Sequence, residues 1–305
     1  MKLADLVDDD SSSKSAADEN FEAKMQVKTW PALRMLVVDF PKAFIDEVNV
    51  FIDEIVIPDN KDYGRSLVGQ IRQDKKSKQL EFPLEGYEFA VEFKKVLNNC
   101  ATAYIQKAFN RKSIAEAFEA WTVHSYAGDY NPRHSHGCNT PAGLSSLMWL
   151  KVPDSIKNLK PNSDAGLHHA SGLVDGWTHF TWGLHSTPDL FRLKEQAQES
   201  MQPIEGKFLI WPNWLDHEVF PFFTEGERRT FVANFNIFDS MEEKQKYSNV
   251  LKEHLEQRNS ISPKDKRGDI PSSESEVDDG HFMITGTDGR YEIDDQGVIR
   301  ETGAK

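Results

Sequence analysis

The chain has 305 residues, of which 38% are hydrophobic, and its formal net charge at pH 7 is −13. This acidic balance disfavours non-specific binding to nucleic acid or to an anionic membrane, because both need a basic surface. Two cysteines provide no disulfide framework, and the sequence shows neither a signal peptide nor an apolar stretch of membrane-spanning length, so we expect a protein of the reducing cytoplasm.

Both ends of the chain are polar and acidic. An Asp-Ser run occupies residues 8–13, and a Ser-Glu-Asp run occupies residues 272–279. Segments with so few apolar groups do not recover the entropy lost on ordering. We therefore predict a disordered arm at residues 1–24, one globular domain over residues 25–258, and an acidic linker with a short hairpin over residues 259–305.

Two helices are expected in the first half of the domain. Over residues 40–57 the apolar side chains, among them Phe44, Val48 and Ile52, recur at the spacing of an amphipathic helix. Residues 87–109 show the same spacing over a longer stretch. The basic run at 72–78 between them is typical of a solvated loop. These patterns assign residues 25–115 to a helical part that packs outside the core.

From residue 117 onward the apolar period changes to two, which indicates strands. A succession of short strands separated by Gly, Pro and Asn turns, with helices on one side, predicts a mainly β fold with flanking helices. The specific expectation is a double-stranded β-helix, a cupin-like jelly roll, over residues 116–240. Its strands are expected near residues 117–127, 144–152, 177–182, 207–211, 218–222 and 229–238, with a helical insertion at 188–201 and a closing helix at 241–258.

Three histidines form a candidate metal site. His134 and His136 are two residues apart, so in an extended strand both side chains point to the same face. His217 follows the apolar run 207–212, which is typical of a buried strand that ends at a proline. Neutral imidazole is the commonest metal ligand in proteins, and a catalytic metal also needs open positions. We expect His134, His136 and His217 to bind one metal ion.

An arginine follows the third histidine at a short distance. In the strand predicted after residue 228, the side chains of Arg228, Thr230 and Asn234 share one face, and Arg229 lies on the other. If Arg228 points inward, its guanidinium can bind a buried carboxylate in bidentate fashion, with the Thr230 hydroxyl as a second donor. Arg229 would then be solvated or paired with an acid, and which arginine anchors the ligand stays open.

Together these elements resemble a known family. The order H-x-H at residue 134, G-x-x-x-x-W-P-x-W-L-x-H ending at residue 217, and R-x-T at residue 228 resembles the iron(II)- and 2-oxoglutarate-dependent oxygenases. The resemblance is to the prolyl-4-hydroxylase-like oxygenases of T4-like phages that infect marine cyanobacteria. Residues 66–71 also resemble that family's Leu-Ala-Gly-Asn-Ile element, and the similarity covers roughly residues 41–239.

The resemblance implies a dioxygenase that uses iron(II), dioxygen and 2-oxoglutarate. Iron would be bound by His134, His217 and a third group, and 2-oxoglutarate would chelate the iron while Arg228 binds its distal carboxylate, with Thr230 and Asn234 beside it. Succinate and carbon dioxide would be released as a protein, peptide or small molecule is hydroxylated. The fold does not name that substrate.

One position departs from the family pattern. Most such enzymes have His-x-Asp, whereas this chain has His136 at the second position. The nearest carboxylates are Asp129, at an odd spacing from the motif, and Asp216, which should face away from His217. We keep His136 as the third ligand. An assignment in which His136 ligates and His134 supports it, and a minor role for Cys138 as a neighbour of the metal, stay open.

Two other function classes are carried forward. One is a cupin-type enzyme that uses a three-histidine metal without 2-oxoglutarate, against which Arg228 and Thr230 argue. The other is a non-catalytic phage binding or structural protein on the same barrel, which the missing aspartate favours. The remaining histidines and the tryptophans are interpreted first as core, surface or loop residues; they are His124, His168, His169, His179, His185, Trp149, Trp177, Trp182, Trp211 and Trp214.

Overall fold

A computed structural model describes residues 24–30, 33–64, 67–72, 78–160, 172–183, 197–260, 291–293 and 299–301. The chain divides into two compact units, Met1–Asn249 and Val250–Lys305. The predicted disordered arm therefore lies outside the described residues except for Lys24, which begins a strand.

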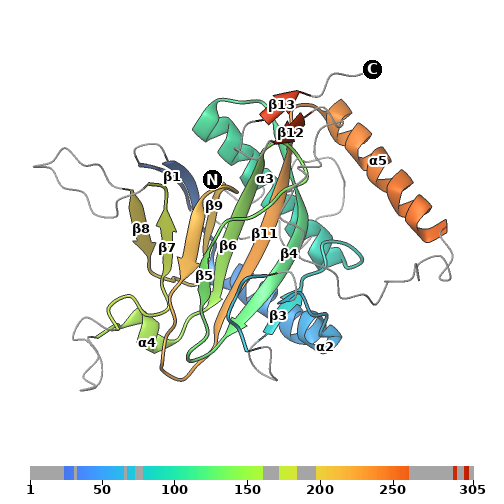
Figure 1. The fold of residues 1–305 in the computed structure, drawn as a ribbon. Coiled ribbons are helices and arrows are strands. Elements are labelled where there is room, and N and C mark those ends of the chain that lie inside the picture. The colour runs from blue at the N-terminus through green and yellow to red at the C-terminus, as the bar shows by residue number, and fades with distance from the viewer. Residues whose placement is uncertain are drawn as a thin grey trace, which may run out of the picture. The chain divides into compact units, whose positions relative to one another are not determined.

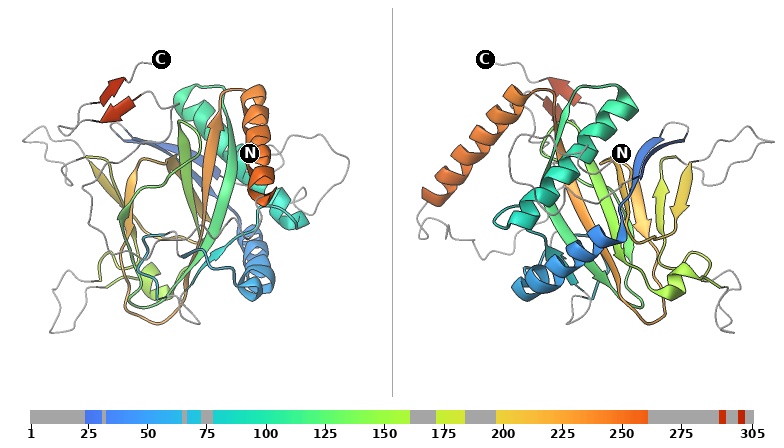
Figure 2. Two further views of the ribbon diagram at one scale, coloured as in Figure 1. Left: turned by 45° about the vertical axis from the view of Figure 1, so that its right-hand side comes forward. Right: turned by 180° about the vertical axis from the view of Figure 1, so that it is seen from behind.

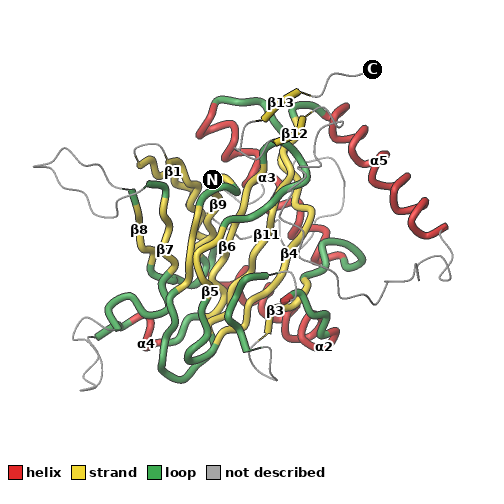
Figure 3. The backbone as a smooth tube through the Cα atoms, viewed as in Figure 1, coloured by secondary structure: helices red, strands yellow, loops and turns green. Residues whose placement is uncertain are grey.

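Two antiparallel sheets build the described part of the first unit (Figures 1 and 3). In sheet order, the large one comprises β1 (Lys24–Trp30), β2 (Leu33–Asp39), β9 (Lys207–Pro212), β6 (Gly143–Lys151), β11 (Arg228–Phe238), β4 (Ile114–Ser125) and β3 (Lys78–Glu81). The small one comprises β5 (Asn131–His134), β10 (Asp216–Val219), β7 (Thr178–Thr181) and β8 (Gln198–Met201). This arrangement is a double-stranded β-helix with flanking helices, so the predicted fold class is confirmed.

The large sheet has an apolar core on each face. Every residue of β11 is buried, and its side chains alternate between the two cores: Phe231 and Ala233 join the cluster that includes helix residues, whereas Val232 joins the cluster that includes Phe180 of the small sheet. Both faces of β11 are therefore buried, and the buried residues include five polar ones: Arg228, Arg229, Thr230, Asn234 and Asn236.

Helices cover the outer face of the large sheet (Figure 2). Helix α1 (Lys42–Phe51) continues through a π-helical turn, η3 (Ile52–Val56), into α2 (Ile57–Asp59), and α3 (Glu88–Phe109) packs against β4. Both predicted helices are therefore present. A short helix, α4 (Asp154–Lys157), follows β6.

Three details differ from the sequence-based expectation. The part expected to be helical, residues 25–115, also contains β1, β2 and β3. β1 pairs with its neighbour β2, whereas β2 also pairs with the distant β9 and β3 pairs with β4. Residues 198–201 of the expected helical insertion form strand β8 on the edge of the small sheet, and residues 188–196 lie outside the described part. The strand expected at 218–222 is β10, which begins two residues earlier and so includes His217.

The chain continues beyond the barrel strands with α5 (Met241–Ser260), at the predicted position of the closing helix. In the second unit, β12 (Tyr291–Ile293) and β13 (Ile299–Glu301) pair antiparallel, at the position of the predicted hairpin. Among the described residues, none of the helices has the length and hydropathy that crossing a membrane requires.

Candidate metal and acid-binding site

A cavity of about 50 Å³ lies between the two sheets and opens to solvent. Its wall includes the three candidate histidines, Arg228 and Thr230. The segment Leu67–Gly69 closes another side, because Gln70 bridges to Tyr130 just before β5. The structure thus brings five of the six predicted site residues, which are far apart in the sequence, to one cavity.

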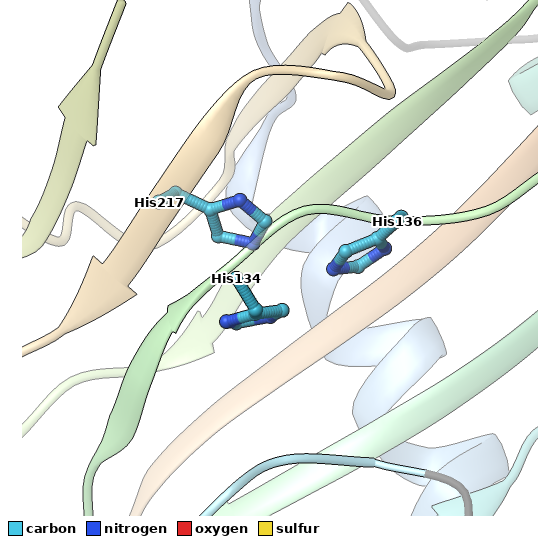
Figure 4. A group of neighbouring side chains, drawn as sticks. All are labelled: His134, His136 and His217. Atoms are coloured by element: carbon cyan, nitrogen blue, oxygen red, sulfur yellow. The ribbon is translucent and has the colours of Figure 1, made fainter. Parts of the chain in front are cut away.

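The three histidines converge from two strands and a loop (Figure 4). His134 on β5 and His217 on β10 are direct partners in the small sheet, and His136 lies two residues beyond the end of β5. The ring centroids of His134 and His217 are 4.3 Å apart, and those of His136 and His217 are 4.9 Å apart. One nitrogen from each ring lies within 4.8 Å of the others, which is a spacing that one metal ion can bridge.

Hydrogen bonds fix which nitrogen of each ring is free. The Nδ1 atom of His134 lies 2.7 Å from the carbonyl oxygen of Pro132, and that of His217 lies 3.2 Å from the carbonyl oxygen of Leu215. A carbonyl only accepts, so both Nδ1 atoms must carry the proton. The Nε2 atoms then keep their lone pairs for a metal, which is the usual arrangement of metal-binding histidines.

The local environment keeps these imidazoles neutral. Burial lowers the pKa of His134 and lowers that of His136 to about 4. Burial also lowers the pKa of His217 well below its usual value, and the neighbouring imidazoles lower it further. A histidine ligates a metal only in its neutral form, so the three rings are ready to do so at neutral pH.

The carboxylates considered as ligands are used elsewhere. Asp216 pairs with Arg133, at 2.7 Å, on the exposed side of β10, and buried Asp129 accepts the backbone N–H of Tyr126. Cys138 donates to the carbonyl oxygen of Thr140. Within the described part of the chain, the candidate donor cluster at this cavity consists of histidines alone.

Arg228 presents a buried cation to the same cavity. Its side chain is 3% exposed, and its described hydrogen bond is from Nη2 to the Thr178 hydroxyl at 3.3 Å. Its Nε atom and the Thr230 hydroxyl are buried without a hydrogen-bond partner in the described part of the protein. Burial lowers the pKa of Arg228 to about 10. A buried cation with an unused donor is the environment that an anionic ligand would satisfy.

Arg229 has a different role on the opposite face of β11. Its guanidinium donates to Glu227 at 2.9 Å and to Asp53 at 2.6 Å. Glu227 also accepts from buried His124, at 2.7 Å, so His124 belongs to this ion-pair cluster. Of the two arginines, Arg228 is the one that lines the cavity.

Asn234 differs from its predicted role as a contact of the acidic ligand. Its Oδ1 atom lies 2.8 Å from Nδ1 of His136, and its Nδ2 atom donates to Glu119 at 2.7 Å. Both polar atoms of the amide are therefore engaged, and Asn234 supports a histidine instead. Sequence reasoning missed Glu119 because its contact with Asn234 spans 115 residues and no local pattern marks it.

The other histidines and tryptophans fit their ordinary interpretations. His179 is buried and lies 2.8 Å from the Ser200 hydroxyl, whereas residues 168, 169 and 185 lie outside the described part. Trp149 and Trp211 are fully buried, and Trp214 is exposed. Trp211 also lines the cavity and contacts His217 edge-on, with ring centroids 5.2 Å apart.

Residues 119–234 match the model of a family described as "Putative 2OG-Fe(II) oxygenase". Over this segment the chain is similar to 2-oxoglutarate and iron(II) oxygenases. The matched segment begins in β4, ends in β11 and contains all three histidines and Arg228. No curated protein matches the chain.

Several solved structures are similar over most of the chain. A Pseudomonas putida prolyl-4-hydroxylase is 11% identical over 64% of this chain and 87% of its own, with a TM-score of 0.39. HygX from Streptomyces hygroscopicus, with nickel and 2-oxoglutarate bound, is 11% identical over 66% and 82%, with a TM-score of 0.40. The viral collagen prolyl hydroxylase of Paramecium Bursaria Chlorella virus-1 is 15% identical over 67% and 94%, with a TM-score of 0.36.

Proposed function

We propose that the protein is an iron(II)- and 2-oxoglutarate-dependent dioxygenase. The observation that carries this proposal is the presence, in one cavity, of three neutral imidazoles with converging nitrogens and of a buried arginine with an unused donor. The match of residues 119–234 to an oxygenase family model supports it. We assign the chain, within this proposal, to the prolyl-4-hydroxylase-like oxygenases of T4-like cyanophages, on the motifs around residues 134, 217 and 228.

The donor set fits iron(II). His134, His136 and His217 each offer an Nε2 lone pair, and imidazole suits iron among the first-row metals. Three protein ligands leave coordination positions for a chelating cosubstrate and for dioxygen. Trp121 and Trp211, which line the cavity beside His136 and His217, limit the access of water to the ligands.

The rest of the cavity fits a dicarboxylate such as 2-oxoglutarate. One carboxylate would accept from the guanidinium of Arg228 and from the Thr230 hydroxyl, which satisfies the two donors that lack partners. The 2-oxo acid group at the other end would then reach the metal. Iron with 2-oxoglutarate supplies an oxidative decarboxylation that yields succinate, carbon dioxide and a hydroxylated product. The prime substrate would be a protein, a peptide or a small molecule.

The all-histidine donor set favours a second candidate, a three-histidine metal enzyme that does not use 2-oxoglutarate. Such an enzyme would have no use for the buried cation of Arg228, whose isolation costs stability. A non-catalytic barrel, the third candidate, would need neither the neutral imidazoles nor the arginine. The two alternatives differ from the main proposal in whether metal and 2-oxoglutarate bind.

The test is spectroscopic. Iron(II) and then 2-oxoglutarate are added anaerobically to the wild type, His134→Ala, Arg228→Ala and the control Arg133→Ala, which removes an exposed cation next to His134. A metal-to-ligand charge-transfer band is expected in the wild type and the control, but not in His134→Ala. In Arg228→Ala it should require far more 2-oxoglutarate. Iron binding without the band would support the three-histidine alternative, and the absence of iron binding would refute the enzyme proposal.

A further inference from the structure

His136 depends on side-chain support more than the other two candidate ligands do. His134 and His217 lie in paired strands, and each donates to a backbone carbonyl two residues earlier in the chain. His136 follows the end of β5, where its backbone is held by two hydrogen bonds with Asn213 at 3.0 Å. The Nδ1 partner of its ring is a side chain, the amide of Asn234.

An amide partner does not by itself select a tautomer. The two ends of the Asn234 side chain have nearly the same shape, so a rotation by half a turn would present the NH₂ group to His136. Nδ1 of His136 would then have to accept, and its proton would move to Nε2. In that tautomer the nitrogen needed for the metal has no free lone pair.

Glu119 removes this ambiguity. A carboxylate only accepts hydrogen bonds, and its Oε1 atom lies 2.7 Å from Nδ2 of Asn234. The NH₂ group must therefore face Glu119, and the carbonyl oxygen must face His136. The second carboxylate oxygen accepts from the Tyr63 hydroxyl, which holds the carboxylate in place.

Aromatic contacts converge on the same ring. Tyr63 stacks on Trp121, with centroids 5.1 Å apart and planes 20° apart, and Trp121 stacks on His136, with centroids 5.6 Å apart and planes 28° apart. His136 is thus oriented on its face by Trp121 and at Nδ1 by Asn234. Tyr63 contacts Trp121 directly and reaches Asn234 only through Glu119.

We infer that Glu119 is a positioning residue, which acts through the Asn234 amide to hold His136 in the tautomer that binds the metal. The inference rests on the proposed metal site, but the tautomer itself can be measured without metal. The inference requires that two hydrogen bonds run in one direction: the His136 ring donates to Asn234, and Asn234 donates to Glu119.

The test exchanges the amide and the carboxylate at positions 119 and 234, which reverses the hydrogen bond between them. Glu119→Gln puts an amide that can donate or accept next to Asn234, so the restraint on the amide is lost. Asn234→Asp places two carboxylates face to face. In the double variant Glu119→Gln/Asn234→Asp, the new amide donates to the new carboxylate, which accepts from the His136 ring. The hydrogen bond between residues 119 and 234 then runs the other way, but the restraint on the His136 tautomer is restored. Glu116→Gln is the matched control, since Glu116 lies on the same strand and pairs with Lys94 and Lys244.

Two measurements are made on the full chain. Two-bond ¹H–¹⁵N correlation spectra of the metal-free protein report which nitrogen of His136 carries the proton, and titration with cobalt(II) gives the affinity and the ligand-field spectrum. Both single variants should bind cobalt(II) about tenfold more weakly, Glu119→Gln should show a mixture of His136 tautomers, and the double variant and the control should resemble the wild type.

The outcomes separate the two claims. Unchanged tautomer and cobalt(II) affinity in Glu119→Gln, or a double variant as weak as the weaker single variant, would overturn the positioning role. A wild type that binds neither cobalt(II) nor iron(II) would refute the proposed function, and the metal-free spectra would still decide whether Glu119 sets the tautomer.

Discussion

Replacing Arg228 by methionine should weaken ligand binding without destabilising the fold. The guanidinium is buried without a carboxylate partner in the described structure, and burial lowers its pKa to about 10. The difference between this pKa and the ordinary pKa of arginine corresponds to a free-energy cost of about 3 kcal/mol for burying the charged guanidinium. The cation is thus held at a cost to the ligand-free protein, which an anionic ligand would offset.

A change of about 3 kcal/mol corresponds to a loss of roughly 150-fold in affinity. We therefore expect Arg228→Met to weaken 2-oxoglutarate binding by about that factor, followed by the charge-transfer band at saturating iron(II) under anaerobic conditions. The free energy of unfolding of the ligand-free variant, measured with urea, should not fall, because methionine fills a similar volume without a charge.

Arg229→Met is the control on the neighbouring residue. It removes the partner of Glu227 and Asp53, so it should lower the free energy of unfolding by about 3 kcal/mol and leave the 2-oxoglutarate affinity of the folded protein unchanged. Wild-type affinity in Arg228→Met, or a destabilisation of Arg228→Met as large as that of Arg229→Met, would refute the reasoning.

Three further predictions concern pH and two glycines. Burial raises the pKa of Glu227, but the hydrogen bonds from His124 and Arg229 and the charge of Arg229 outweigh it and hold the pKa at about 2. The resulting stabilisation, about 3 kcal/mol, is present above pH 4.5 and is lost as the pH falls toward 2. Urea unfolding of Glu227→Gln should therefore differ from that of the wild type at pH 7 but not near pH 2, and an equal difference at both would contradict this. Gly69→Ala would place a Cβ 2.4 Å from Oδ1 of Asn131 inside the cavity, so 2-oxoglutarate turnover should fall about tenfold or more with cobalt(II) affinity unchanged; a parallel loss of metal would show a wider disruption. Gly206 has φ +87°, and an alanine there would place its Cβ 2.6 Å from the Phe40 carbonyl oxygen. Gly206→Ala should therefore lower the melting temperature by the equivalent of about 2 kcal/mol. An unchanged melting temperature would contradict the argument.

The sequence was sufficient to find the elements whose evidence is local. Helix α3 and strands β6 and β11 have apolar patterns long enough to identify alone, and the alternation along β11 correctly separated Arg228 from Arg229. His134, His136 and His217 were found because histidine spacing and a later buried strand are both visible in one chain.

The elements that were missed depend on distant partners. Strand β5 has the sequence Asn-Pro-Arg-His and no apolar alternation, and it is a strand because it pairs with β10 more than 80 residues later. Strand β8 likewise exists through its pairing with β7. The support of His136 by Asn234 and Glu119 joins three segments, so only the folded structure could reveal it.

The register of strand β11 decides which of its side chains face the cavity. Arg228, Thr230 and Asn234 owe their common orientation to an even spacing within one ladder, which is paired on both sides with β4 and β6. A slip of one residue would still bring an arginine, Arg229, to the cavity. It would also bring phenylalanines to the places of Thr230 and Asn234, filling the cavity and leaving His136 without its partner. An insertion or deletion inside this strand should therefore disrupt the acid-binding and the histidine-supporting parts of the site together, even where the sheet itself survives.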